Sequence, residues 1–202
     1  MGKRVSATWV VVLVKDFGSA KQRLGPALDP RRRRALARRN AQRAIRAAAA
    51  GEHRLVVAGS EEAGEVARKL SADFIVEPRP EGQNTAARRG IAYALEHGAE
   101  AVLLLSSDLP FVQRRAIREL LKAAEAEDGE VVVAVPAIGR GGTNALYLRP
   151  PGVIQLHFGG DSLTLFRHDA ERRGVRFLLH ESAEMALDLD EPEDLERLRR
   201  AV

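Results

Sequence analysis

Short apolar runs of strand length alternate along this chain with longer segments that have helical periodicity. Several of the runs, such as VVVLV and AVLLL, are continuous stretches without polar alternation. Strands of that composition are buried on both faces, which requires helices on both sides of the sheet. The alternation therefore predicts a mostly parallel, doubly wound α/β sheet.

The pattern predicts seven strands and six helices. Strands are expected at 9–14, 54–58, 74–77, 101–106, 130–135, 145–149 and 175–179, and helices at 31–50, 61–70, 85–97, 113–126, 162–173 and 192–200. The 202 residues suit one well-filled domain, so we expect a single domain over 1–202. A stretch rich in Gly and Pro at 136–162 breaks the alternation, which is typical of a functional loop or insert.

Composition excludes several classes of protein. There is no cysteine, which rules out disulfides, thiolate metal sites and cysteine nucleophiles. The apolar runs are far shorter than the ~20 residues of a membrane helix. The first run is followed at once by Lys15 and Asp16 and by no cleavage site, so it is interpreted as a strand and not as a signal peptide. We expect a cytoplasmic enzyme or binding protein with no membrane partner.

The charge balance is mildly basic. Lys and Arg number 32 against 28 acids, for a net charge of +4. The run Arg31 to Arg34 is typical of a solvated helix start, and the scarcity of aromatic residues argues against nucleic acid as a partner. A non-catalytic protein that binds anions or RNA stays open as the alternative.

Lysine is much rarer than arginine, yet two lysines follow the first strand. That loop carries Lys15, Lys21 and Arg23, together with Gly18 and Ser19. It is neither a P-loop nor a G-x-G-x-x-G motif. Lysine and arginine bind phosphate oxygens well, so the loop would suit a polyphosphate, although an ordinary surface loop is the alternative interpretation.

Three carboxylates stand at the ends of apolar segments. Asp108 directly follows the strand at 101–106, where it either caps the next turn or holds Mg²⁺ for a nucleotide phosphate. Asp188 and Asp190 are two residues apart, so in an extended chain both side chains point to the same side. Two such carboxylates repel each other unless a cation lies between them. Helix capping is an alternative for Asp190 and a poor one for Asp188.

Other catalytic patterns are missing from the sequence. The five histidines show no spacing typical of a metal site. No G-x-S-x-G sequence or similar nucleophile motif is present, which argues against covalent hydrolase chemistry.

Six short motifs occur in an order that resembles one enzyme family. They are V-K-x-x-x-x-A-K-x-R-L from Val14, a Gly-x-Asn helix start at Gly82 and Asn84, SDLP from Ser107, GGTNAL from Gly141, FGGDS from Phe158, and LDLDEPEDL from Leu187. This chain resembles the 2-phospho-L-lactate guanylyltransferases, also described as phosphoenolpyruvate guanylyltransferases, of deazaflavin coenzyme biosynthesis. The resemblance implies a nucleotide-diphospho-sugar transferase-like (Rossmann-like) fold and transfer of GMP from GTP to a small phosphorylated carboxylic acid, with release of pyrophosphate.

The resemblance also implies roles for individual residues. Lys15, Lys21 and Arg23 would hold the triphosphate, and Asp108 with Asp188 or Asp190 would hold Mg²⁺. Gly82 and Asn84 would lie beside the nucleoside, with Asn84 on the base or ribose. Thr143, Gly159 and Ser162 match positions that contact the acceptor, and hydroxyls near a helix start suit an anion. Capping of the helix is a compatible interpretation of Ser162.

The chain departs from the family pattern at a few positions, among them Gln83, where an apolar residue is common. Alternatives therefore stay open for the nucleotide, and for the acceptor: 3-phosphoglycerate, a pterin or a sugar phosphate.

Overall fold

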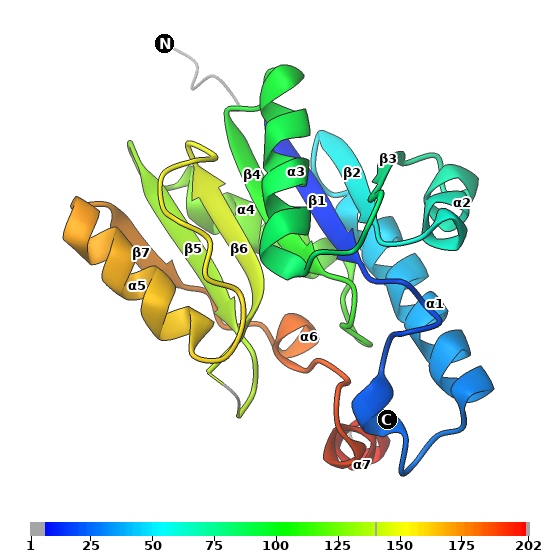
Figure 1. Ribbon diagram of the computed structural model, residues 1–202. Helices are drawn as coiled ribbons and strands as arrows, with labels where there is room; N and C mark the ends of the chain where they lie inside the picture. Colours follow the sequence, from blue (N-terminus) through cyan, green and yellow to red (C-terminus); the bar gives the residue numbers. More distant parts are fainter. Residues whose placement is uncertain (1–6, 140, 201–202) are drawn as a thin grey trace.

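One sheet of seven strands organises the part of the chain that the computed structural model describes, residues 7–139 and 141–200 (Figure 1). The strands are β1 (Thr8–Val14), β2 (His53–Ala58), β3 (Asp73–Val76), β4 (Ala101–Ser106), β5 (Val131–Pro136), β6 (Thr143–Arg149) and β7 (Arg176–Leu179). Their order in the sheet is β3-β2-β1-β4-β6-β5-β7. Only β6 runs antiparallel to its neighbours, β4 and β5. The expected mostly parallel α/β fold is confirmed.

The direction of winding reverses between β1 and β4. From β1 the chain moves outward to β2 and β3, then returns to the other side of β1 as β4. In open α/β sheets the ligand binds beyond the carboxyl ends of the strands at such a reversal. We therefore expect a ligand site among the residues that follow β1 and β4.

Helices cover both faces of the sheet, each over its own apolar cluster. The helices α1 (Pro30–Ala48), α2 (Glu61–Lys69), α4 (Arg114–Glu125) and α6 (Ala183–Ala186) pack on one face, and α3 (Gln83–Glu96) and α5 (Ser162–Arg173) pack on the other. Alternate residues of β1 serve the two sides, since Val10 and Val12 belong to the first cluster and Val11 and Leu13 to the second.

A third, smaller apolar cluster joins residues that follow β1 to residues near α7 (Pro192–Arg200). It includes Leu24 from the 3-10 helix η1 (Gln22–Leu24), Leu36 from α1, and Leu187 and Leu189, which precede α7. The sequence did not predict η1 or α6, because three or four residues are too few to show a helical period.

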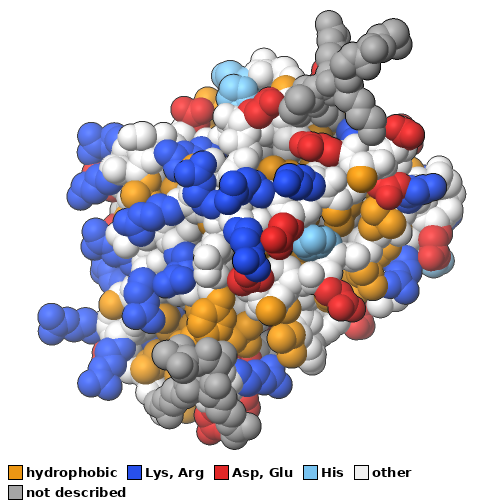
Figure 2. Space-filling model, turned by 180° about the vertical axis from the view of Figure 1, so that it is seen from behind, with side chains coloured by type: hydrophobic (Ala, Val, Ile, Leu, Met, Phe, Trp, Pro, Cys, Tyr) orange, Lys and Arg blue, Asp and Glu red, His pale blue; other side chains and the backbone are white. Residues whose placement is uncertain are grey.

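The helix α1 starts as expected. The Asp29 carboxylate accepts a hydrogen bond from the Arg32 N–H at 2.9 Å, so the arginine run lies in the first turn. Arg34 forms an ion pair with Glu62 at 2.7 Å. Figure 2 views the face with α1, α2 and α4 and shows Lys and Arg side chains gathered on one side of it. The RNA-binding alternative stays an untested prediction. No helix of residues 7–139 and 141–200 combines the length and the hydropathy needed to cross a membrane.

The helix α3 lies unusually close to the sheet at Gly90. A Cβ atom there would lie 2.5 Å from Cγ1 of Val11 and 3.0 Å from Cγ2 of Val57, and both valines are fully buried. A glycine at this position therefore sets the distance between α3 and the strands β1 and β2.

Replacing Gly90 with alanine is expected to destabilise the protein. Overpacking costs about 1–3 kcal/mol, whereas the gain in helix propensity is at most about 1 kcal/mol. A net loss of about 1 kcal/mol would lower the melting temperature by about 2–4 °C. Thermal unfolding measures this loss, with Gly152→Ala as the control because no atom beyond the adjacent residues lies within 4 Å of that Cβ position. A Gly90→Ala protein as stable as the wild type would contradict the close packing.

Candidate active site

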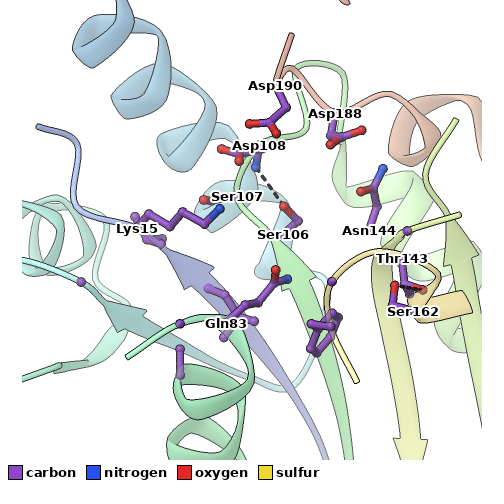
Figure 3. A pocket seen from close by; sticks show the side chains of 18 of the residues that line it. Lys15, Gln83, Ser106, Ser107, Asp108, Thr143, Asn144, Ser162, Asp188 and Asp190 are labelled. Atoms are coloured by element: carbon purple, nitrogen blue, oxygen red, sulfur yellow. Dashed lines mark hydrogen bonds between the residues drawn. The ribbon is translucent and has the colours of Figure 1, made fainter. Parts of the chain in front are cut away.

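A cavity of about 500 Å³ opens at the carboxyl edge of the sheet, beyond β1 and β4. The ends of β1 to β4 form part of its wall, and the first residues of β6 join them because that strand is antiparallel (Figure 3). Nine of the eleven site residues expected from the sequence line it: Lys15, Arg23, Gly82, Asp108, Thr143, Gly159, Ser162, Asp188 and Asp190. Lys21 and Asn84 do not.

The loop after β1 brings Lys15 to the cavity. Figure 3 shows its side chain extending into the cavity. Gly59, after β2, backs this loop: its N–H donates to the Val14 carbonyl at 2.8 Å, and a Cβ atom there would lie 2.8 Å from the Asp16 nitrogen. The close approach of two backbones therefore fixes the place from which Lys15 projects.

Asp16 shapes the same loop and carries a negative charge. Desolvation by burial opposes ionisation, but hydrogen bonds from the backbone N–H groups of Ser19 and Gly18 outweigh it and lower the pKa of Asp16. The Ser19 N–H lies 2.9 Å from Oδ2 of Asp16. This residue lines the cavity, and the sequence prediction did not include it.

Lys21 is buried and does not line the cavity. Its backbone is left-handed, with φ 62°, and its side chain is only 1% exposed. The ammonium lies 2.9 Å from Oδ1 of Asp108 and donates a hydrogen bond to the Leu189 carbonyl. The expected contact with a triphosphate stays a prediction, but in this structure Lys21 neutralises the carboxylate at the end of β4.

The segment at 187–190 follows the alternation expected from the sequence. Leu187 and Leu189 are buried, while Asp188 and Asp190 line the cavity. The Leu189 N–H donates to the Asp108 carbonyl at 3.2 Å, which holds this segment against the end of β4. Figure 3 accordingly shows the three carboxylates at one end of the cavity. The prediction that both aspartates face the same side is confirmed.

Arg23 and Asp190 meet at the rim of this end. The guanidinium of Arg23 lies 3.3 Å from the Asp190 carboxylate, and its side chain is 68% exposed. Behind them, the carboxylate of Asp194, in the first turn of α7, accepts the backbone N–H groups of Asp190 at 2.9 Å and Glu191 at 2.8 Å. Asp194 therefore anchors the segment that carries Asp190.

The donors at the acidic end suit Mg²⁺ in the company of a nucleotide. Mg²⁺ prefers oxygen ligands and is usually bound through one or two carboxylates together with substrate phosphates. Within residues 7–139 and 141–200, no group of three or more His, Asp or Glu side chains would hold a metal ion by itself. Asp108, Asp188 and Asp190 offer carboxylate oxygens at this end of the cavity, the ligand type that Mg²⁺ prefers.

The opposite side of the cavity is formed by the end of β3 and the start of α3. Glu77 is buried and forms an ion pair with Arg89 of α3 at 2.5 Å. Gly82 precedes α3 with φ 93°, a conformation that favours glycine. Figure 3 shows the Gln83 side chain turned toward the cavity. This wall is where the sequence places the nucleoside.

Thr143 and Ser162 form the hydroxyl pair of the expected acceptor region. Both are buried, and the Ser162 hydroxyl donates to Oγ1 of Thr143 at 3.1 Å. The capping interpretation of Ser162 is wrong, because Asp161 occupies the N-cap and Ser162 is the first residue of α5. Gly159, with φ 143°, lines the cavity beside them.

Asn144 is a site residue that the sequence prediction missed. Its side-chain NH₂ group donates to the carbonyls of Met185 at 2.9 Å and Ala186 at 3.0 Å, and so ties the start of β6 to the chain that leads to Asp188. A signal was present, because a buried amide inside an apolar strand has to find hydrogen-bond partners. The partners themselves, about forty residues further on, could not be inferred.

Known proteins are similar to this chain over nearly its whole length. The family model described as "Guanylyl transferase CofC like" matches residues 8–199. A phosphoenolpyruvate guanylyltransferase from Rubrobacter xylanophilus is 41% identical, covering 95% of this chain and 93% of the relative. A 2-phospho-L-lactate guanylyltransferase from Methanocaldococcus fervens is 30% identical, covering 92% and 82%.

A solved structure supports the fold independently. A nucleotidyl transferase from Methanothermobacter thermautotrophicus superimposes with a TM-score of 0.67 at 19% identity, covering 96% of this chain and 97% of that one. The family match over residues 8–199 and the relative that is 41% identical show that the chain belongs to the CofC-like guanylyltransferases, a family of nucleotidyltransferases.

Proposed function

We propose that this protein is a Mg²⁺-dependent guanylyltransferase of deazaflavin coenzyme biosynthesis. It transfers GMP from GTP to the phosphate of phosphoenolpyruvate or 2-phospho-L-lactate. The observation that carries the proposal is the single cavity in which cations from the first loop, carboxylates at the ends of β4 and the 187–190 segment, and the Thr143–Ser162 hydroxyl pair meet. The names of the relatives from Rubrobacter and Methanocaldococcus support the choice of base and acceptor.

The reaction joins two anions and needs little chemistry from the protein beyond positioning and charge neutralisation. An oxygen of the acceptor phosphate bonds to the α-phosphorus of GTP. The bond from that phosphorus to the oxygen that bridges to the β-phosphate breaks, and the electron pair leaves with pyrophosphate. No proton has to move, since the attacking oxygen is already ionised.

Each side of the cavity has a part in this reaction. Lys15 and Arg23 neutralise the triphosphate, and the Thr143 hydroxyl, which accepts the Ser162 hydroxyl, donates a hydrogen bond to the acceptor. Asp108, with Asp188 or Asp190, would hold Mg²⁺, which when bound supplies charge neutralisation for the phosphates. Gly82 and Gln83 lie beside the nucleoside.

Pyrophosphate release in the presence of Mg²⁺ tests the proposal. GTP, ATP, CTP and UTP are each combined with phosphoenolpyruvate, 2-phospho-L-lactate or 3-phosphoglycerate. We expect release with GTP and one of the first two acids, and phosphoenolpyruvate as the better acceptor, given the higher identity to the Rubrobacter relative. Release with another nucleotide or only with 3-phosphoglycerate would correct the substrates, and no release from folded protein would overturn the proposal.

Replacing Thr143 with valine is expected to weaken acceptor binding. The change keeps the shape of the side chain and removes one hydroxyl, and a hydrogen bond to a charged group contributes about 1.5–3 kcal/mol, or roughly 10–100-fold in KM for the acceptor. Saturation curves for the acceptor and for GTP measure the two KM values, and only the KM for the acceptor should rise. Thr164→Val, at an exposed position of α5, is the matched control. An unchanged acceptor KM in the Thr143→Val protein would remove Thr143 from the acceptor site.

A further inference from the structure

Asn84 makes two hydrogen bonds to the backbone of one distant residue. Its Nδ2 donates to the Phe158 carbonyl at 3.0 Å, and the Phe158 N–H donates to its Oδ1 at 2.8 Å. The carboxamide thus pairs with Phe158 as a neighbouring strand would, across 74 positions of sequence. A charged or apolar side chain at position 84 could not bond to both the N–H and the carbonyl of Phe158, whereas a carboxamide offers a donor and an acceptor together.

Phe158 begins the loop that forms the acceptor side of the cavity. Phe158, Gly159 and Gly160 line the cavity, and the Gly159 carbonyl accepts the Ser162 N–H at 3.4 Å. The Phe158 ring packs edge-on against Phe166 of α5, with ring centroids 5.2 Å apart. The position of the Phe158 backbone therefore affects the positions of Gly159 and of the Thr143–Ser162 pair.

Asn84 belongs to the other wall of the cavity. It is the second residue of α3, and the residues just before it, Gly82 and Gln83, line the nucleoside side. Asn84 itself is not among the residues that line the cavity. Its position between two walls and its two bonds to the loop suit a tether better than a contact with base or ribose.

We propose that Asn84 is a positioning residue that holds the acceptor loop, residues 158–160, against the start of α3. Acceptor binding then depends on Asn84, which belongs to the nucleoside wall. The two substrate sites are thereby held at a fixed position relative to each other. This inference rests on the proposed function for the identity of the two sites. The tether itself is a property of the fold.

Two variants separate the tether from a direct contact with nucleotide. Asn84→Ala removes both hydrogen bonds. Asn84→Asp keeps the acceptor for the Phe158 N–H but replaces the donor with an oxygen that repels the Phe158 carbonyl. We expect KM for the acceptor to rise about tenfold or more in Asn84→Ala, with KM for GTP within about twofold of the wild type. Asn84→Asp should also raise KM for the acceptor, because a carboxylate oxygen then faces the Phe158 carbonyl. Lys15→Ala is the comparison, because it should raise KM for GTP instead.

Hydrogen–deuterium exchange of the ligand-free proteins gives a readout that does not require turnover. The peptide spanning 156–162 should exchange faster in Asn84→Ala than in the wild type, while the peptides of β4 and β5 stay protected. A raised KM for GTP with an unchanged acceptor KM would overturn the proposal, and so would unchanged exchange at 156–162. If the wild type releases no pyrophosphate, the proposed function fails, and the exchange result still decides whether Asn84 tethers the loop.

Discussion

Replacing Asp108 with asparagine is expected to lower kcat for guanylyl transfer by about 100- to 1000-fold, the size of effect seen when one preorganised electrostatic group is removed from an active site. Asparagine keeps the shape of the side chain and loses its charge. Asp108 lies after β4 on the cavity wall, where its side chain is 21% exposed and forms an ion pair with Lys21, while its backbone carbonyl accepts the Leu189 N–H. The loss should fall on kcat at saturating substrates, with a higher Mg²⁺ concentration needed for half-maximal rate.

The control for this prediction is Asp73→Asn, at an exposed position of the edge strand β3. It makes the same chemical change away from the cavity and should leave turnover at the wild-type value. Binding of Mn²⁺ in the presence of GTP, followed by electron paramagnetic resonance, gives a second measurement independent of rate. Turnover in Asp108→Asn within a few-fold of the wild type would show that this carboxylate does not serve the reaction.

Replacing Lys21 with methionine is expected to destabilise the protein. Breaking a buried ion pair from one side leaves the other charge uncompensated, at a cost of about 3–5 kcal/mol for full burial. Asp108 retains some exposure, so we expect about 2–3 kcal/mol, at the lower end of that effect. The melting temperature should fall by about 4–12 °C. The hydrogen bond from Lys21 to the Leu189 carbonyl is lost as well.

A double mutant distinguishes a role of Lys21 in neutralising Asp108 from a role in binding phosphate. Methionine at position 21 with asparagine at position 108 removes both charges, so it should recover part of the stability that Lys21→Met loses. Lys122→Met, on the exposed face of α4, is the matched control. If the ammonium served mainly to hold GTP, Lys21→Met would keep the wild-type melting temperature and raise KM for GTP.

The sheet and the acidic end of the cavity could be predicted because their signals are local. Short apolar runs predicted all seven strands to within two residues, and the continuous Val and Leu runs among them, β1, β4 and β5, are the ones whose burial on both faces leaves that pattern. The alternation of Leu187 and Leu189 with Asp188 and Asp190 likewise placed both carboxylates on one side. In both examples, side chains of an extended chain alternate between two sides, so the spacing of residues determines which side each one faces.

The partners of Lys21 and Asn84 could not be predicted, because each depends on a segment that is distant in sequence. Lys21 faces inward because η1 and the 187–190 segment pack together through Leu24 and Leu189. Asn84 contacts Phe158 because α3 and the chain that leads to α5 lie on the same face of the sheet. Charge and motif order identified these residues, while tertiary packing decided what they contact.

The identity of the reaction product distinguishes guanylyl transfer from hydrolysis of GTP. Wild-type protein, GTP, Mg²⁺ and phosphoenolpyruvate or 2-phospho-L-lactate are incubated, and the products are followed by ³¹P NMR and mass spectrometry. We expect equal amounts of pyrophosphate and of a new unsymmetrical diphosphate that joins GMP to the acid. Formation of GDP with inorganic phosphate, or of free GMP with no diphosphate to the acid, would contradict guanylyl transfer.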